Sequence, residues 1–206
     1  MQERGHNWGG FVNEYTSFDM VPYNIYSSVR VSLDGKPLDI HGVAKSKLKL
    51  NKEARKNILG VQGQLWAETI RSYDMIEYLL FPKLLGLSER GWNASPIWQD
   101  DTDDVRYVKE LVTYNAKIVS KELPRLAKYG VHFRLAQPGI SVDNNMLSMN
   151  CAKPDAEIHY TIDGSEPTSS STLWTAPVEC GAELIKARSF YVGKQSSTTI
   201  YSTADN

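Results

Sequence analysis

A tryptophan and a carboxylate close together are the residues of this 206-residue sequence whose spacing best suits chemistry. Trp66 and Glu68 follow a short apolar run that begins at Ile58. Residues two apart on a strand point to the same side of a sheet, so both side chains can face one ligand. An aromatic face stacks on the C–H groups of a sugar, and a carboxylate accepts hydrogen bonds from its hydroxyls. The pair indicates a sugar site, although a buried Trp beside a salt-bridged Glu fits the residues equally well.

Other kinds of catalytic centre find little support. The histidines, at positions 6, 41, 132 and 159, lack the spacing of metal ligands, and we expect no metal and no cofactor. The sequence has no Gly-x-Ser-x-Gly elbow for a nucleophilic serine. The two glycines Gly60 and Gly63 are not followed by the third glycine and the lysine of a phosphate-binding loop.

The segment around Trp66 predicts half of a βα repeat. The run 58–66 combines apolar and small residues and is typical of a buried strand in a parallel sheet. Ser72 offers a helix N-cap, and Asp74 suits the first turn of that helix. Apolar residues then recur three and four apart, which predicts a helix that packs on one face and kinks at Pro82.

A second predicted helix follows, and after it the apolar residues change from helical spacing to alternation. The helix is predicted by valines at helical spacing, with Pro124 restarting or bending it and Gly130 ending it. These valines are Val105, Val108, Val112 and Val119. Beyond Gly130, residues 157–163 alternate, 164–167 form a turn, and 184–192 make another strand. We therefore predict one domain over residues 1–132 and a small β-sandwich over 133–206.

Composition excludes several classes of protein. The 41% hydrophobic and 23% charged residues are typical of a packed globule, and the net charge of −1 gives no support for nucleic-acid binding. No apolar run approaches the ~18 residues of a membrane span. Only Cys151 and Cys180 are present, and we expect two free, mostly buried thiols rather than a disulfide.

Three segments together resemble the family 20 glycoside hydrolases, the β-N-acetylhexosaminidases. Residues 58–92 carry Gly-x-Gln-x-x-Leu-Trp-x-Glu-Thr and then Glu-Tyr-x-x-Phe-Pro-x-Leu-x-x-Leu-x-Glu-Arg-x-Trp, similar to the last barrel strand and helix of that family. Residues 3–11 resemble the segment after the seventh strand. Residues 153–178 and 185–199 resemble the small β-domain that follows such barrels. The resemblance implies an α/β plus all-β chain, with about the last two βα units of a (β/α)8 barrel before a β-sandwich.

The resemblance also implies a function and its limits. In this family the 2-acetamido group of the substrate attacks C1, and an Asp-Glu pair supplies the general acid and its orienting partner. No Asp-Glu dipeptide occurs in the 206 residues, so we expect no catalytic residue here and no activity of this chain alone. Trp66 would wall the pocket of a terminal N-acetylhexosamine, Glu68 would bind its distal hydroxyls, and Trp8 would stack on the next sugar.

The same resemblance implies what the protein binds and in which compartment it works. The substrate would be an oligosaccharide ending in N-acetylhexosamine. Residues 1–132 would pack against the N-terminal part of a barrel or self-associate. The family is usually exported, although the polar residues 1–6 lack the apolar core of a signal peptide.

The alternative is a non-catalytic carbohydrate-binding or adhesion module. In it, Tyr160, Trp174 and Tyr191 of the β-domain would form an exposed platform; packing of these aromatics in a core or between domains is the favoured interpretation.

Overall fold

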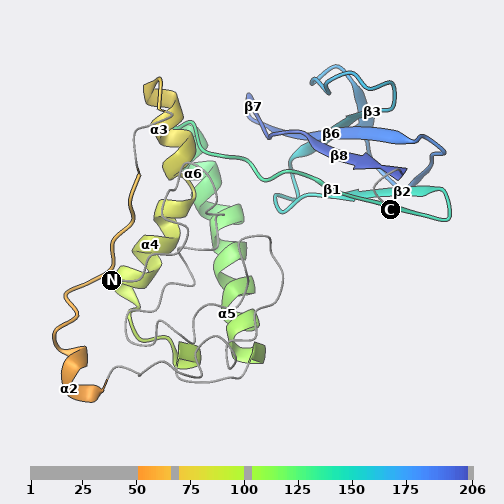
Figure 1. The fold of residues 1–206 in the computed structure, drawn as a ribbon. Coiled ribbons are helices and arrows are strands. Elements are labelled where there is room, and N and C mark those ends of the chain that lie inside the picture. Colours follow the sequence, from red (N-terminus) through yellow and green to blue (C-terminus); the bar gives the residue numbers. More distant parts are fainter. Residues whose placement is uncertain (1–50, 66–69, 100–103, 204–206) are drawn as a thin grey trace. The chain divides into compact units, whose positions relative to one another are not determined.

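The computed structural model describes residues 51–65, 70–99 and 104–203 (Figure 1). The chain divides into two compact units, Met1–Phe133 and Arg134–Asn206. In the described part, the first unit contains helices and the second contains antiparallel strands.

The first unit is a succession of short helices joined by loops. Its α-helices are α2 (Lys52–Arg55), α3 (Tyr73–Leu80), α4 (Lys83–Trp92), α5 (Asp104–Lys117) and α6 (Leu123–Lys128). A 3₁₀ turn, η1 (Ile97–Gln99), precedes α5, and a π turn, η2 (Ile118–Glu122), joins α5 to α6. None of the described helices is both long enough and apolar enough to cross a membrane.

The helix predicted after Ser72 forms, but as two helices. The Ser72 hydroxyl caps α3 by accepting a hydrogen bond from the Met75 N–H at 3.2 Å, as the sequence indicated. Pro82 ends the run: α3 stops at Leu80, and α4 begins after Pro82, which is its N-cap residue. Proline has no N–H to donate and its ring clashes with the preceding turn, so a break replaces the expected kink.

The strand predicted before Trp66 is wrong over its described part. Residues 58–65 contain no strand, and Leu59 is 99% exposed. A strand takes its hydrogen bonds from a neighbouring strand, and the described part of the first unit contains none. The apolar run alone therefore does not produce a strand in this chain.

The face that α5 buries also differs from the prediction. Val105, Val108 and Val112 are 75%, 51% and 61% exposed. The buried residues are instead Tyr107, Tyr114 and Ile118, which recur seven and four apart. Both sets have helical spacing, and the tyrosines bury more apolar area than valines do, which favours their face.

Two positions near the end of the first unit explain how its last helix begins and ends. Pro124 stands in the first turn of α6, directly after the π turn. A π turn is one way a helix accommodates a residue without an N–H, and the interruption expected at Pro124 takes this form. Gly130 follows the helix with φ of 74°, the left-handed conformation of a glycine C-cap, as predicted.

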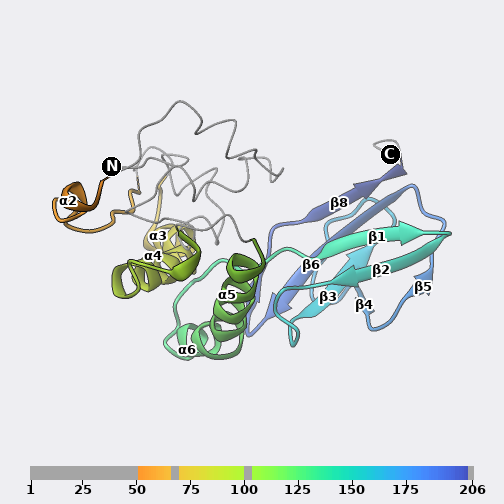
Figure 2. The same cartoon turned by 90° about the horizontal axis from the view of Figure 1, so that it is seen from below.

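The second unit is a β-sandwich (Figures 1 and 2). One sheet has the order β1-β2-β5, and the other has the order β4-β3-β6-β7, with β8 also paired to β6. The strands are β1 (Gly139–Asp143), β2 (Met146–Asn150), β3 (Glu157–Thr161), β4 (Thr172–Trp174), β5 (Val178–Glu179), β6 (Leu184–Tyr191), β7 (Lys194–Gln195) and β8 (Thr199–Ser202). The strands predicted at 157–163 and 184–192 are confirmed as β3 and β6.

The core lies between the two sheets. Alternate residues of β2, β3 and β6 point inward and are at most 5% exposed: Leu147, Met149, Ile158, Ile185 and Ala187. On β6 the intervening residues Lys186 and Arg188 point to the opposite side, as the period of a strand requires. The sandwich therefore has an apolar inner face and a charged outer face.

Two hairpins of the sandwich close through the same kind of two-residue turn. Asn144 and Asn145 join β1 to β2 with φ of 48° and 64°. Val192 and Gly193 join β6 to β7 with φ of 46° and 71°. Positive φ at both positions defines a type I′ turn, which favours Asn or Gly and disfavours a β-branched residue. Val192 is thus a strained residue, and its side chain is 65% exposed.

We expect Val192→Asn to raise the free energy of unfolding of the β-domain by about 1 kcal/mol, because asparagine tolerates the left-handed conformation. The matched substitution Asn144→Val should lower it by a similar amount. Urea unfolding of both variants checks this. A Val192→Asn variant no more stable than the parent chain would contradict the strain.

The two cysteines lie near opposite ends of β2. The Cys180 N–H donates to the Asn145 carbonyl at 2.8 Å, just before the strand, and Cys151 follows its last residue. A five-residue strand separates its ends by roughly 13 Å, well beyond the ~7 Å over which a disulfide can join two Cα atoms. Both thiols are free, as expected, and both are half-buried.

Thiol titration under denaturing, non-reducing conditions should therefore find two reactive groups per chain, even after exposure to a mild oxidant. If the protein had no reactive thiols and no intermolecular cross-link, its two cysteines would be joined within one chain. That result would contradict the strand register, which places them near opposite ends of β2.

Candidate functional site

The residues predicted to bind sugar, Trp8, Trp66 and Glu68, lie outside the described residues. Their positions relative to one another stay a prediction. What the structure does describe is the chain on both sides of the pair 66–68: the segment 58–65 before it and α3 after it. Gln64, Leu65 and Ile70, the described residues nearest to the pair, are half-buried.

Contacts of α3 tie this helix to the end of the first unit. The Glu77 carboxylate accepts a hydrogen bond from the His132 N–H at 2.7 Å, although 55 residues separate the two. The ring of Tyr78 meets the His132 ring edge-on, with centroids 5.9 Å apart. These contacts hold α3, the helix that follows the predicted site, against the chain at His132.

Helix α4 buries two cations, Lys83 and Arg90, completely. Arg90 Nη2 lies 3.4 Å from Glu110 Oε1 and 3.7 Å from Glu89 Oε1. Its guanidinium also stands 5.4 Å from the ring centroid of Trp98. A buried charge is tolerated only with such partners, so Arg90 joins α4, η1 and α5 into one packed group.

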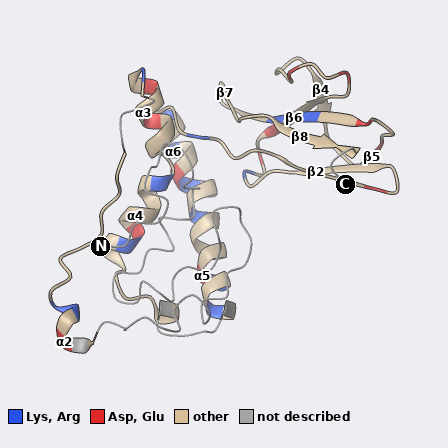
Figure 3. Cartoon of the chain, viewed as in Figure 1, with Lys and Arg blue, Asp and Glu red and all other residues tan. Residues whose placement is uncertain are grey.

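In the sequence, Arg90 was noted only as part of a family motif, and its burial was not predicted. The one signal for burial was its place near the end of an amphipathic helix, where an arginine side chain can point either to the core or to solvent. Figure 3 shows Lys and Arg mixed with Asp and Glu along α4 and α5, so charge alone does not mark the buried position.

The aromatics of the alternative binding platform have other roles in the β-domain. Tyr160 and Trp174 pack against the core of the sandwich. The face of Tyr191 is occupied by Lys153, whose Nζ lies 4.1 Å from the ring centroid. Lys153 is itself buried and paired with Asp155, whose pKa this contact holds below its ordinary value. The three rings therefore do not form one open stacking surface.

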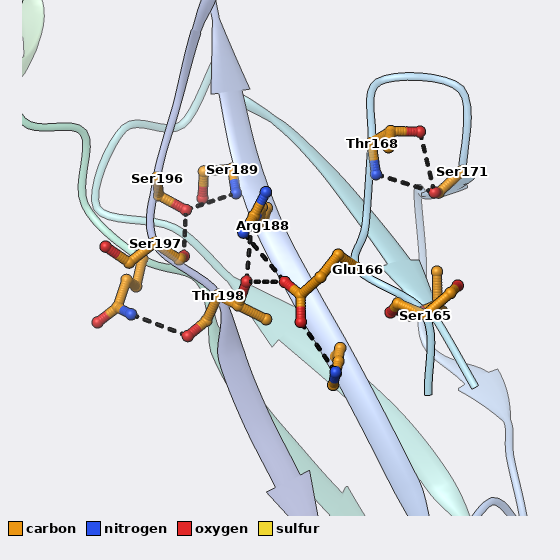
Figure 4. Close-up of polar contacts among 12 residues, drawn as sticks. Ser165, Glu166, Thr168, Ser171, Arg188, Ser189, Ser196, Ser197 and Thr198 are labelled. Atoms are coloured by element: carbon orange, nitrogen blue, oxygen red, sulfur yellow. Dashed lines mark hydrogen bonds and ion pairs between the residues drawn. The ribbon is translucent and has the colours of Figure 1, made fainter. Parts of the chain in front are cut away.

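A polar cluster on the outer face of the five-stranded sheet is the most connected group of charged side chains in the β-domain (Figure 4). Glu166 Oε1 accepts from Lys186 Nζ at 2.8 Å. Glu166 Oε2 accepts from Arg188 Nη2 at 3.0 Å and from the Thr198 hydroxyl at 2.6 Å. The hydrogen bond from Lys186, followed by that from Thr198, holds the pKa of Glu166 below its ordinary value.

In the described part of the chain, no group of three or more His, Cys, Asp or Glu residues could hold a metal ion. His159 is buried, with its Nδ1 2.8 Å from the Ser171 carbonyl and its Nε2 3.4 Å from Glu157 Oε2. These contacts join β3 to the loop that precedes β4.

Two family models match the chain, in the same order as its two units. The glycosyl hydrolase family 20 catalytic domain matches residues 4–95, and the chitobiase/beta-hexosaminidase C-terminal domain matches residues 137–202. The first match includes all three predicted sugar-binding positions. The second coincides with the β-sandwich.

Curated relatives agree with both models. A beta-hexosaminidase of Vibrio vulnificus is 27% identical over 79% of this chain and 21% of its own length. The N,N'-diacetylchitobiase of Vibrio harveyi is 25% identical over 79% of this chain and 19% of its own length. A beta-hexosaminidase of Porphyromonas gingivalis is 27% identical over 70% of this chain and 18% of its own length.

The chain thus spans about a fifth of the length of these relatives. The names of the relatives agree with the two matched domains. Along this chain, a match to part of the glycosyl hydrolase family 20 catalytic domain is thus followed by a match to the chitobiase/beta-hexosaminidase C-terminal domain.

Proposed function

We propose that this chain is the C-terminal part of a β-N-acetylhexosaminidase that removes terminal N-acetylhexosamine residues from oligosaccharides. The observation that carries the proposal is the ordered match of two domains of this family along one chain. The names of the relatives, which include beta-hexosaminidases and a diacetylchitobiase, support the same substrate class.

The first unit is proposed to supply about the last two βα units of a (β/α)8 barrel. Helices α3 and α4 would then belong to the outer ring, and residues 58–66 would become a barrel strand once parallel neighbours lie on both sides. The carboxyl end of that strand would carry the site.

The proposed mechanism is retaining and substrate-assisted. The 2-acetamido oxygen of the bound sugar attacks C1, so the protein needs a general acid for the leaving oxygen and no protein nucleophile. The Asp-Glu pair that performs this work in the family is not among these 206 residues. The contribution of this chain is therefore binding: Trp66 walls the pocket, Glu68 orients the sugar through its hydroxyls, and Trp8 stacks on the following sugar.

Export of the whole protein is part of the proposal. Its substrates, oligosaccharides with terminal N-acetylhexosamine, suit a periplasmic, cell-surface or secreted enzyme. Fractionation of the cells that make the protein, with detection by an antibody to the β-domain, would show the compartment.

Substitutions at the two strongest site positions test the proposal in the complete enzyme. Glu68→Gln keeps the shape of the side chain but removes its charge, which should weaken transition-state binding by ~1–3 kcal/mol. Trp66→Ala should cost more, because it removes a wall and admits water, and Trp66→Phe should recover part of the loss. The measurement is kcat/KM on a chromogenic N-acetylglucosaminide.

Glu53→Gln, at an exposed position of α2, is the matched control and should leave kcat/KM unchanged. The assignment fails if Glu68→Gln behaves like this control, or if Trp66→Ala lowers activity only in proportion to lost folded protein.

A further inference from the structure

The loop between β3 and β4, residues 162–171, is attached to the outer face of the five-stranded sheet. The side chains that hold it, Lys186 and Arg188, alternate with the core residues of β6 and so point away from the core. Pro167, in the middle of the loop, is fully buried. The loop thus forms a cover over a part of the sheet that would otherwise be open.

Most of the attachment converges on one side chain. Glu166 uses both carboxylate oxygens, reaching Lys186 and Arg188 on β6 and Thr198 just before β8. Arg188 Nε donates in turn to the Thr198 hydroxyl at 2.7 Å, which closes the network (Figure 4). One carboxylate therefore joins the loop to two neighbouring segments of the sheet.

The remaining polar contacts of the loop are at its ends or within it. The Thr161 hydroxyl donates to the Ser165 carbonyl at 2.7 Å, and Asp163 accepts from the Ser165 N–H at 3.0 Å. At the other end, His159 Nδ1 meets the Ser171 carbonyl. Bonds of this kind keep the ends in place and the loop in shape, but they do not hold its middle against β6.

Two buried side chains mark where the loop lies against the sheet. His159 on β3 is only 5% exposed, and its Nδ1 lies 2.8 Å from the Ser171 carbonyl of the loop. Pro167 of the loop is itself fully buried. If the middle of the loop lifted, Pro167 and the two cations of β6 would become accessible to solvent.

We propose that residues 162–171 form a strap with Glu166 as its latch, closed while Glu166 is ionised and released when that carboxylate is neutralised or screened by salt. Release frees Lys186, Arg188 and Thr198, and it exposes Pro167. The sandwich core beneath is untouched, because its residues lie on the other face of β6.

The charges around the latch determine the direction of its pH dependence. Lys186 and Arg188 face Glu166 from β6, and Asp163 on the strap itself also interacts with Lys186. Because the pKa of Glu166 is lowered in the closed form, the latch is at full strength above the ordinary pKa of a carboxyl group. It weakens as the pH falls through the lowered value.

His159 holds the far end of the strap rather than its middle. Its Nδ1 lies 2.8 Å from the Ser171 carbonyl, and its Nε2 lies 3.4 Å from Glu157 Oε2. Loss of the contacts of Glu166 therefore leaves the Ser171 end of the strap in place.

Hydroxyl-radical labelling of the full chain, analysed by mass spectrometry, tests the strap directly. The readout is Pro167, and exposed Tyr129 in the other unit is the internal reference. In Glu166→Gln near neutral pH, the open fraction should rise about threefold, because the two ion pairs that are lost are partly exposed and each stabilises the closed form only modestly. In the parent chain, acid should raise the open fraction by the same amount, and raised salt should also increase it.

Glu179→Gln is the matched control, since Glu179 is exposed and makes no side-chain hydrogen bond or ion pair in the described structure. The Glu179→Gln variant should be labelled to the same extent as the parent chain. In Glu166→Gln, acid should cause little further increase in labelling. The proposal is overturned if Glu166→Gln labels like the control, if it retains the full acid response, or if the core residue Leu147 becomes labelled together with Pro167.

Discussion

A β-strand is stable only where neighbouring strands accept and donate its backbone hydrogen bonds, and this requirement separates the two units of the chain. In the second unit, β6 pairs with β3 along one edge and with β7 and β8 along the other. Every strand pair described there is antiparallel, and both strands of each pair belong to this unit. The β-sandwich therefore completes itself within residues 134–206.

The first unit does not satisfy this requirement from its described residues. Helices provide their own backbone hydrogen bonds. Helix α3 begins at the Ser72 cap and α6 is followed by Gly130, both as the sequence indicates. The segment 58–65 contains no strand, and valines on α5 are exposed. In the proposed enzyme, the rest of a barrel would supply these partners, so the proposed sugar site would depend on more than this chain.

Local signals were sufficient wherever local contacts decide the structure. The Ser72 cap, the glycine at 130, and the alternation of β3 and β6 were each readable because a single residue or a period of two determines them. The face of α5 was predicted wrongly, since valines and tyrosines have the same spacing and only packing chooses between them. The latch of Glu166 depends on Lys186, Arg188 and Thr198, residues 20, 22 and 32 positions away, and no local pattern shows it. Trp8, Trp66 and Glu68 were found from sequence motifs, and their geometry stays a prediction.

The central claim is that this chain carries sugar-binding residues of a family 20 enzyme without the acid that cleaves the substrate. The direct measurement is hydrolysis of a chromogenic N-acetylglucosaminide by the purified 206-residue chain, next to the complete enzyme at equal molarity. General acid catalysis contributes ~10²–10⁴-fold, and the site also lacks the neighbours of its strand, so the account predicts no turnover above background. Turnover that stays with the chain through successive purification steps would contradict it.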